Sequence, residues 1–369
     1  MKRTTPPFRA DHVGSLLRTA PLKEARARRQ KGEISSDELK AIEDREISAI
    51  IRKQEDIGLQ AVTDGEFRRA FWNYDFLGAL PGVEAYLGER KIKFQGVNPK
   101  PMMLRVTGKL GAFSSHPMLG HFTFVREHTR ALPKMTIPSP SSLHFRYGRD
   151  AVPESIYPDM NDFHRDLGQT YRRAIHAFAD AGCRYLQLDE VNFAYLCDPK
   201  LRAQVINRGD DPERLPAIYA GMINAAVSGI PSDMTTAMHL CRGNFQSTFV
   251  ASGGYEPVAE TLFNTINVNG YFMEYDSDRA GSFEPLRFVP KGKTIVLGLV
   301  TSKSGRLESK DEIKRRINEA TKYVPLEQLC ISPQCGFAST EEGNILAEDE
   351  QWAKLRMIVE IAEEVWGKK

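Results

Sequence analysis

His239 and Cys241 are the residues whose types and spacing point most directly to chemistry. They lie two positions apart in AMHLCRGN, a stretch that follows an apolar run and precedes a glycine. On an extended strand, residues i and i+2 project from the same face, so both side chains can reach one ion. Imidazole nitrogen and thiolate sulfur are common zinc ligands. The pair therefore predicts half of a metal site, with packing in a core as the alternative reading.

Two further residues complete a candidate zinc site. Glu274 lies in the strand-like segment FMEYD, and Cys335 lies in SPQCGF, directly before a glycine where the chain can turn sharply. One imidazole, two thiols and one carboxylate form a tetrahedral donor set suited to Zn²⁺. A thiol that enters such a site ionises near neutral pH because the metal lowers its pKa. The resulting thiolate is a good nucleophile, so the predicted chemistry is attack of a thiol on a carbon electrophile.

These side chains need strands that end at one place. Eight strand-like segments alternate with helical patterns; they cover residues 10–15, 59–64, 134–139, 185–190, 234–241, 270–275, 294–301 and 329–335. Amphipathic stretches with helical spacing lie between them, at residues 36–58, 160–182, 311–324 and 349–366. This alternation predicts an α/β fold, a (β/α)8 TIM barrel.

One segment interrupts the alternation. Residues 88–130 contain KIKFQG and MMLRVTGKL, which predict an antiparallel insertion before the third barrel strand. No linker rich in Ser, Gly or Pro, no short repeat and no low-complexity tract divides the sequence. Residues 1–369 are therefore expected to form a single TIM-barrel catalytic domain.

The ends of the expected strands carry far more titratable groups than a purely structural barrel needs. In such barrels the loops that follow the strands converge on one mouth, where the catalytic residues lie. The polar side chains at these ends are Asp11, His12, Ser15, Asp64, Glu66, Asp189, Glu190, His239, Cys241, Glu274, Asp276, Thr301, Ser302 and Cys335. Their gathering predicts an enzyme.

Composition excludes several classes of partner. The formal net charge is +2, from 50 basic and 48 acidic residues, so neither a nucleic-acid footprint nor a polybasic membrane patch is expected. No apolar run reaches the roughly 20 residues of a membrane helix, and the N-terminal stretch has no apolar signal region. Five cysteines in so long a chain indicate reduced thiols rather than a disulfide framework. A cytoplasmic protein that acts on small molecules is expected, and a homodimer is left open.

Taken together, the motifs resemble the catalytic C-terminal half of cobalamin-independent methionine synthase. The segments HVGS, TDGEFRR, LQLDE, HLC, MEYD and SPQCGF occur in the family's order along nearly the whole chain. The resemblance implies a 5-methyltetrahydropteroyltriglutamate–homocysteine S-methyltransferase-like enzyme built on a (β/α)8 barrel. It also implies that zinc activates homocysteine and is held by His239, Cys241, Glu274 and Cys335. The full-length enzyme has two barrels in tandem, so this chain looks like a single-barrel relative.

The resemblance also implies where homocysteine binds. Ser15, preceded by Gly14, would meet the substrate carboxylate, and Glu66 and Asp189 would hold the amino group as the catalytic pair. This distribution suits a zwitterion, which needs anions at its ammonium end. The alternative is that the two acids form ion pairs with arginines: Arg68, Arg69 or Arg184.

Two departures from the family pattern concern the methyl donor. Thr301, in GLVTSKS, stands where the family carries a catalytic histidine, and a threonine hydroxyl cannot replace an imidazole as a proton donor near neutral pH. The third-strand loop IPSPSSLHFRYG lacks the family's tryptophan platform; His144 and Phe145 stand near that position. His12 is a candidate substitute for the missing acid, or a core histidine that contacts a backbone carbonyl.

Three functions follow from these observations. The first is zinc-dependent methylation of homocysteine to methionine, with 5-methyltetrahydrofolate (mono- or polyglutamate), a methyl-corrinoid or another methyl donor. The second is alkyl transfer to another thiol, as in epoxyalkane:coenzyme M transferases; the retained acids favour an amino-acid thiol over a sulfonate thiol. The third is a barrel of the uroporphyrinogen decarboxylase type, which needs no metal and is disfavoured by the four candidate ligands.

Overall fold

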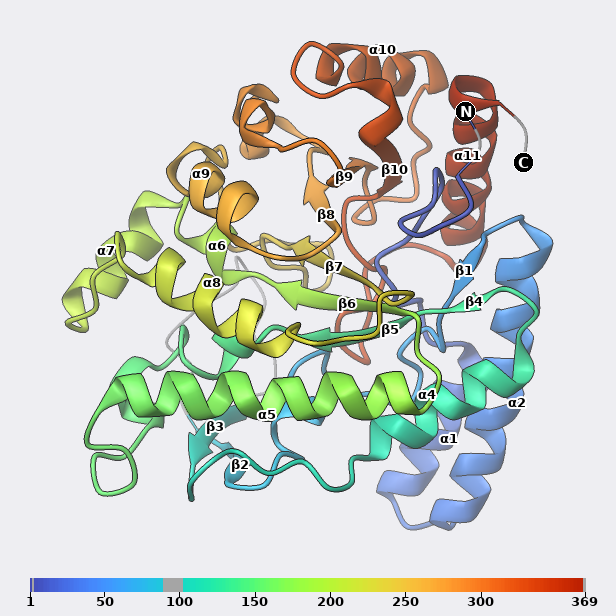
Figure 1. Ribbon diagram of the computed structural model, residues 1–369. Coiled ribbons are helices and arrows are strands. Elements are labelled where there is room, and N and C mark those ends of the chain that lie inside the picture. Colours follow the sequence, from blue (N-terminus) through green and yellow to red (C-terminus); the bar gives the residue numbers. More distant parts are fainter. Residues whose placement is uncertain (2, 89–101, 368–369) are drawn as a thin grey trace.

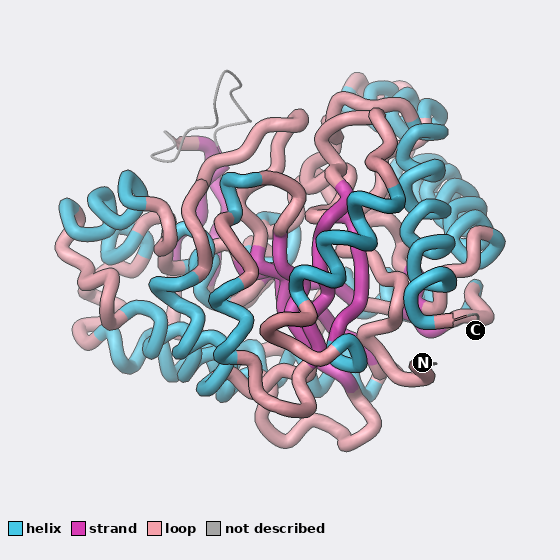
Figure 2. Tube along the Cα trace, turned by 90° about the horizontal axis from the view of Figure 1, so that it is seen from above, coloured by secondary structure: helices cyan, strands magenta, loops and turns pink. Residues whose placement is uncertain are grey.

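The computed structural model describes residues 1, 3–88 and 102–367, and a parallel sheet lies at its centre (Figure 1). The sheet has six strands in the order β10–β9–β8–β7–β6–β5. They are β5 Met135–Pro138, β6 Tyr185–Glu190, β7 Thr235–Leu240, β8 Gly270–Glu274, β9 Thr294–Val300 and β10 Leu329–Pro333. All of their residues except the first of β7 are buried, as expected for parallel strands covered on both faces. Figure 2 shows these strands in the interior with helices around them. The predicted α/β class is confirmed.

The first two expected strands are much shorter than the sequence pattern predicts. The segment 10–15 contributes a single parallel bridge, from Ala10 to Ile331 of β10. The segment 59–64 contributes β1 Ala61–Val62, which pairs in parallel with β4 Leu132–Pro133. Gly14 and Gly65 have φ values of 136° and 64°, so the extended backbone breaks directly after each of these pairings. Among the described residues the central sheet thus has six strands where eight were expected. The segment 10–15 bridges to the edge strand β10, and β1 pairs with β4, which directly precedes the other edge strand, β5.

The helices alternate with the strands as the apolar spacing predicts. They are α1 Ala20–Gln30, α2 Ser36–Asp56, α3 Tyr74–Leu77, α4 Pro117–His128, α5 Met160–Asp180, α6 Asn192–Tyr195, α7 Pro199–Asn207, α8 Leu215–Ala226, α9 Glu256–Thr265, α10 Lys310–Ala320 and α11 Glu348–Trp366. Helix α2 begins at a capping box, in which the Ser35 hydroxyl accepts from the Glu38 amide and the Glu38 carboxylate accepts from the Ser35 amide. Helix α5 buries one apolar stripe and lies beside α8 (Figure 1). In the described ranges, no helix combines the length and apolar character needed to cross a membrane.

The segment before the third expected strand contains an antiparallel pair. Strand β2 Val83–Leu87 pairs with β3 Met102–Val106 over five residue pairs. Strand β2 begins before residue 88, where the insertion was expected to start. Helix α4 occupies the later part of the expected insertion. KIKFQG lies outside the described residues, whereas MMLRV forms β3.

Candidate functional site

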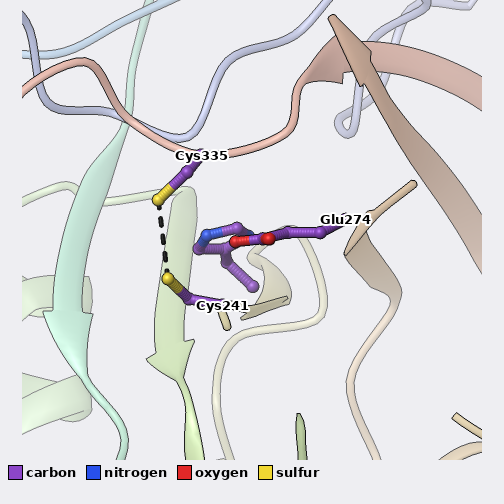
Figure 3. A group of neighbouring side chains, drawn as sticks. Cys241, Glu274 and Cys335 are labelled. Atoms are coloured by element: carbon purple, nitrogen blue, oxygen red, sulfur yellow. Dashed lines mark hydrogen bonds between the residues drawn. The ribbon is translucent and has the colours of Figure 1, made fainter. Parts of the chain in front are cut away.

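The four candidate metal ligands form one buried group. Their ligand atoms all lie within 4.8 Å of one another, and Figure 3 shows the side chains of Cys241, Glu274 and Cys335 converging. The arrangement follows from the sheet: β7 carries His239 with Cys241 just past its end, the adjacent β8 ends at Glu274, and Cys335 follows β10. The C-terminal ends of parallel strands meet at one edge, so residues far apart in sequence become neighbours.

The donor set fits a zinc ion. His239 is buried, and within the described part of the chain neither of its ring nitrogens has a hydrogen-bond partner. An imidazole buried without partners costs free energy, which coordination of a metal would offset. The Sγ atoms of Cys241 and Cys335 lie 3.6 Å apart, well beyond the about 2.05 Å of a disulfide. Their hydrogen bond holds the pKa of Cys335 well below its usual range and raises that of Cys241, so the pair readily supplies a thiolate.

Hydrogen bonds hold the carboxylate of Glu274 in place. Its Oε1 accepts from the backbone amide of Arg242 at 3.1 Å, and its Oε2 accepts from the guanidinium of Arg279 at 2.9 Å. The same Arg279 nitrogen donates to Asp276 at 2.7 Å. Metal-ligating carboxylates are commonly oriented by such outer contacts. These two hydrogen bonds hold the Glu274 carboxylate beside the two thiols (Figure 3).

A pocket of about 650 Å³ opens over this group. Its wall includes three of the four metal candidates, all but Glu274, together with Ser15, Glu66 and Asp189 of the expected substrate site. Gly14 lies behind the wall: a Cβ placed there would approach Oε1 of Glu66 to 3.7 Å and Cγ2 of Thr136 to 2.7 Å. One cavity therefore brings together the predicted thiol-activating and amino-acid-binding residues, whose roles stay predictions.

Glu66 and Asp189 form an acidic corner of the pocket. Burial, together with the negative charge of Glu66, raises the pKa of Asp189 to about 7, and burial also raises the pKa of Glu66. Asp189 accepts from Gln187 at 2.6 Å, whereas Oε2 of Glu66 has no hydrogen-bond partner among the described residues. Glu66 also has φ 60°, a conformation that a non-glycine residue adopts at a cost and that clusters at functional sites. Two buried acids with spare acceptor capacity favour binding of a cation such as an ammonium group.

Of the two acids in this corner, only Glu66 is paired with an arginine. Arg69 lies 3.5 Å from Glu66 and donates to the backbone carbonyl of Thr136. The other two arginines pair elsewhere, Arg68 with Glu43 and Asp44, and Arg184 with Asp233. The ion-pair alternative therefore holds for Arg69 with Glu66 alone, and Asp189 is in no ion pair with another described residue.

The Ser15 hydroxyl is positioned by the loop after β10. It accepts from the backbone amide of Ala338 at 3.3 Å, and the backbone carbonyl of Ser15 accepts from the Phe337 amide. Gly336 touches the same hydroxyl so closely that a Cβ there would lie 1.9 Å from Ser15 Oγ. Ser15 can therefore occupy its place in the pocket wall only because residue 336 has no side chain.

Gly336→Ala is expected to weaken amino-acid binding and to lower the stability of the fold modestly. The added methyl group forces the Ser15 hydroxyl out of its place, at about 1–3 kcal/mol for an overpacked position. We expect about 10-fold weaker binding of L-methionine by calorimetry, with a modest fall in Tm. Gly221→Ala, in helix α8, meets nothing within 4 Å and is the control; it should leave methionine affinity unchanged and raise Tm slightly, because alanine favours a helix over glycine. Unaltered methionine affinity in Gly336→Ala would contradict the assigned role of Ser15.

The residues weighed as replacements for the family's histidine and tryptophan lie away from the pocket wall. Thr301 lines a separate surface depression, and its backbone amide donates to Glu308. His12 is buried with Nε2 3.3 Å from the carbonyl of Ala61, as the core reading predicts. His144 is buried with Nδ1 2.8 Å from the hydroxyl of Tyr219, and Phe145 packs against Tyr195. None of the three candidate substitutes lines the cavity.

Sequence reasoning missed an aromatic and cationic part of the wall. Phe71 and Trp72 belong to the aromatic-rich stretch AFWNYDF that follows TDGEFRR, and this density of aromatic residues was a signal that could have revealed them. The backbone of this stretch is joined to the loop after β10 by the Phe71–Thr340 bridge. Arg146 and Tyr195 complete this side; the Arg146 guanidinium lies 6.0 Å from the Trp72 ring centre.

Comparisons with known proteins place the chain in one family. A family model for the catalytic domain of cobalamin-independent synthase matches residues 8–104 and 155–364. The uncharacterized protein YxjH of Bacillus subtilis is 53% identical over 99% of this chain and 96% of its own length. Two longer Bacillus enzymes named 5-methyltetrahydropteroyltriglutamate–homocysteine methyltransferase are 22% identical, and this chain spans 42% of their length.

Solved structures give the same result. A putative vitamin-B12 independent methionine synthase from Listeria monocytogenes is 41% identical, with a TM-score of 0.79 over 99% of this chain and 100% of that one. A B12-independent methionine synthase from Shewanella sp. W3-18-1, solved in complex with selenomethionine, is 19% identical and shares the fold, with a TM-score of 0.71 over 96% of each chain. The chain therefore belongs to the cobalamin-independent methionine synthase family, and it is a methyltransferase that matches the catalytic domain of that family.

Proposed function

We propose that this protein transfers a methyl group to the thiol of homocysteine, giving methionine, with a zinc ion held by His239, Cys241, Glu274 and Cys335. The observation that carries the proposal is the shared pocket, whose wall contains three of the four candidate metal ligands, His239, Cys241 and Cys335, together with the acidic corner. A metal that binds the substrate thiol supplies a thiolate nucleophile at neutral pH. The acidic corner supplies the site for the ammonium group of the same molecule.

The protein residues have separate tasks in this reaction. Glu66 and Asp189 hold the substrate ammonium group, and Ser15, with neighbouring backbone amides, receives its carboxylate. This anchoring fixes the thiol over Cys241 and Cys335 and turns a bimolecular attack into an oriented one. The solved complex of the Shewanella enzyme with selenomethionine supports an amino-acid ligand in this fold.

The proposed catalytic unit is residues 1–369, with the six-stranded sheet completed into a TIM barrel. The Asp11 amide donates to the carbonyl of Ile331 in β10, and the Lys134 amide donates to the carbonyl of Val62 in β1. The segment that leads to Ser15 lies between β10 and the segment that follows β1, because the Leu16 amide donates to the carbonyl of Gly65. These bonds support closure of the sheet between β10 and β5 through the two short strand positions.

The alternative of another acceptor thiol fits the pocket less well. A sulfonate thiol would place its anion near the amino-acid-binding groups, where Glu66 and Asp189 are both buried and acidic. Like charges at close range in a buried site are strongly unfavourable. An amino-acid thiol places an ammonium group there instead.

The purified protein is expected to hold about one zinc ion per chain and to form methionine from homocysteine. The experiment measures metal content and then methionine formation with four donors supplied separately: methyltetrahydrofolate as mono- and polyglutamate, methylcobalamin and S-methylmethionine. Formation of methionine with any of them, dependent on zinc, supports the proposal. A protein that is free of metal after zinc loading, or that methylates a sulfonate thiol in preference to homocysteine, would overturn it.

A further inference from the structure

Methyl transfer from a nitrogen requires a proton donor. The residue at the position of the family's catalytic histidine, Thr301, does not supply one. As the C–N bond breaks, its electron pair returns to nitrogen, and a positioned proton donor speeds this step by about 10²–10⁴-fold. Thr301 stands in place of the family's histidine but lines a separate surface depression rather than the pocket. His12 and His144 also lie outside the pocket wall. The candidates for a proton donor are therefore the other side chains of the pocket wall, apart from Glu66 and Asp189, which are assigned to the substrate ammonium group.

Tyr195 is a hydroxyl donor in the wall of the pocket with no assigned partner. It is fully buried, and its Oη has no hydrogen-bond partner among the described residues. Oη is directed toward the loop that carries Cys241, because a Cβ placed on Gly243 would lie 3.1 Å from it. A buried hydroxyl left unpaired costs free energy, so a ligand atom that accepts from it would stabilise the site.

The chain places Tyr195 and the amino-acid site on one structural unit. Strand β6 ends with Asp189 and Glu190, and helix α6 follows immediately and ends at Tyr195. A backbone hydrogen bond from the Tyr195 amide to the carbonyl of Val191 holds this short turn against the strand end. The hydroxyl is therefore fixed relative to the group that anchors the substrate ammonium, as an acid positioned for one reaction requires.

Arg146 provides the charge that a tyrosine acid needs. It lines the same pocket. Burial raises the pKa of Tyr195, the positive charge of Arg146 lowers it, and the charges of Cys241, Glu274 and Cys335 raise it further. The phenol is thus protonated at neutral pH and can donate. A nearby guanidinium stabilises the phenolate that remains after the proton has left.

We propose that Tyr195, assisted by Arg146, is the general acid that protonates the leaving nitrogen when this enzyme takes its methyl group from an N-methyl donor. This inference rests on the proposed function. In the step, the homocysteine sulfur forms a bond to the methyl carbon while the N–CH₃ bond breaks, and the electron pair of that bond stays on nitrogen. Nitrogen takes the proton of the Tyr195 hydroxyl, and the phenolate later regains a proton from water.

Tyr195→Phe tests the proposal with two electrophiles that differ in their leaving group. Methyl iodide releases iodide, which needs no proton, whereas methyltetrahydrofolate releases a nitrogen that does. We expect the variant to keep its zinc content, its affinity for homocysteine and its rate with methyl iodide. Its turnover with methyltetrahydrofolate should fall by about 10²–10⁴-fold.

Tyr219→Phe is the matched control. Its hydroxyl is also fully buried but contacts His144 outside the pocket, so this variant should match the wild type with both electrophiles. Wild-type turnover of Tyr195→Phe with methyltetrahydrofolate, or equal losses with both electrophiles, would overturn the role of the acid. A wild-type protein that reacts with methyl iodide but with no N-methyl donor would leave no reaction for the acid to assist and would also overturn the proposal. Failure of the wild-type protein to methylate homocysteine even with methyl iodide would instead count against the proposed function.

Discussion

Replacing Cys241 or Cys335 with serine is expected to remove zinc from the protein and to abolish homocysteine methylation. Each thiol contributes one of four candidate ligand atoms that lie within 4.8 Å of one another. A serine hydroxyl is a far weaker zinc ligand than a thiolate, because it does not ionise near neutral pH. Loss of an outer-shell partner alone costs about 10–100-fold in metal affinity, so loss of a ligand should exceed that range.

The measurement is metal content after dialysis, followed by zinc affinity in competition with a chelator. Cys183→Ser is the matched control: this thiol is also buried but donates to the carbonyl of Tyr185, away from the ligand group. The control should retain zinc and activity. Full zinc content in both Cys241→Ser and Cys335→Ser would contradict the metal site, and loss of zinc in the control would point to misfolding instead.

The grouping of the four candidate metal ligands could be predicted from the sequence because it depends on regular structure. His239 and Cys241 share a strand face, and the strands that carry Glu274 and Cys335 end at the same edge of the sheet. Period-two projection and the convergence of parallel strand ends are general properties, so the four residues could be associated without coordinates. The six strands from β5 to β10 were expected because strand-like segments alternate with amphipathic helical stretches in this part of the sequence.

The opposite wall of the pocket was not predictable in the same way. Trp72, Arg146 and Tyr195 lie in loops or in a four-residue helix, where no periodicity relates sequence spacing to direction. Their placement depends on tertiary bonds, such as the Trp72 amide donating to the carbonyl of Ser339, far along the chain. The short first strand has a similar explanation: ADHVGS has a strand-like pattern, but Gly14 adopts φ 136° and ends the extended backbone.

Asp189→Asn is expected to weaken binding of the amino-acid substrate and to remove its dependence on pH. Removing one charged partner of a buried pair costs about 2–5 kcal/mol, so we expect L-methionine to bind about 100-fold more weakly at pH 8. Methionine is the preferred probe because it keeps the ammonium and carboxylate groups of homocysteine but has no thiol that titrates. Calorimetry between pH 5.5 and 8.5 measures both the affinity and its slope.

The pH dependence follows from the pKa of Asp189, which burial and the charge of Glu66 raise to about 7. Above pH 7 Asp189 is ionised and attracts the ammonium group; below pH 7 it takes up a proton, so wild-type affinity should fall by up to about 10-fold per pH unit. The side-chain amide of the Asp189→Asn variant cannot ionise, so the variant should show no such slope. Glu190→Gln is the control, because the Glu190 carboxylate is buried next in sequence but accepts from Ser141 and the Asn192 amide outside the pocket wall. A steep slope that persists in Asp189→Asn would assign the titration to Glu66, and wild-type affinity in that variant would contradict the ammonium-binding role of Asp189.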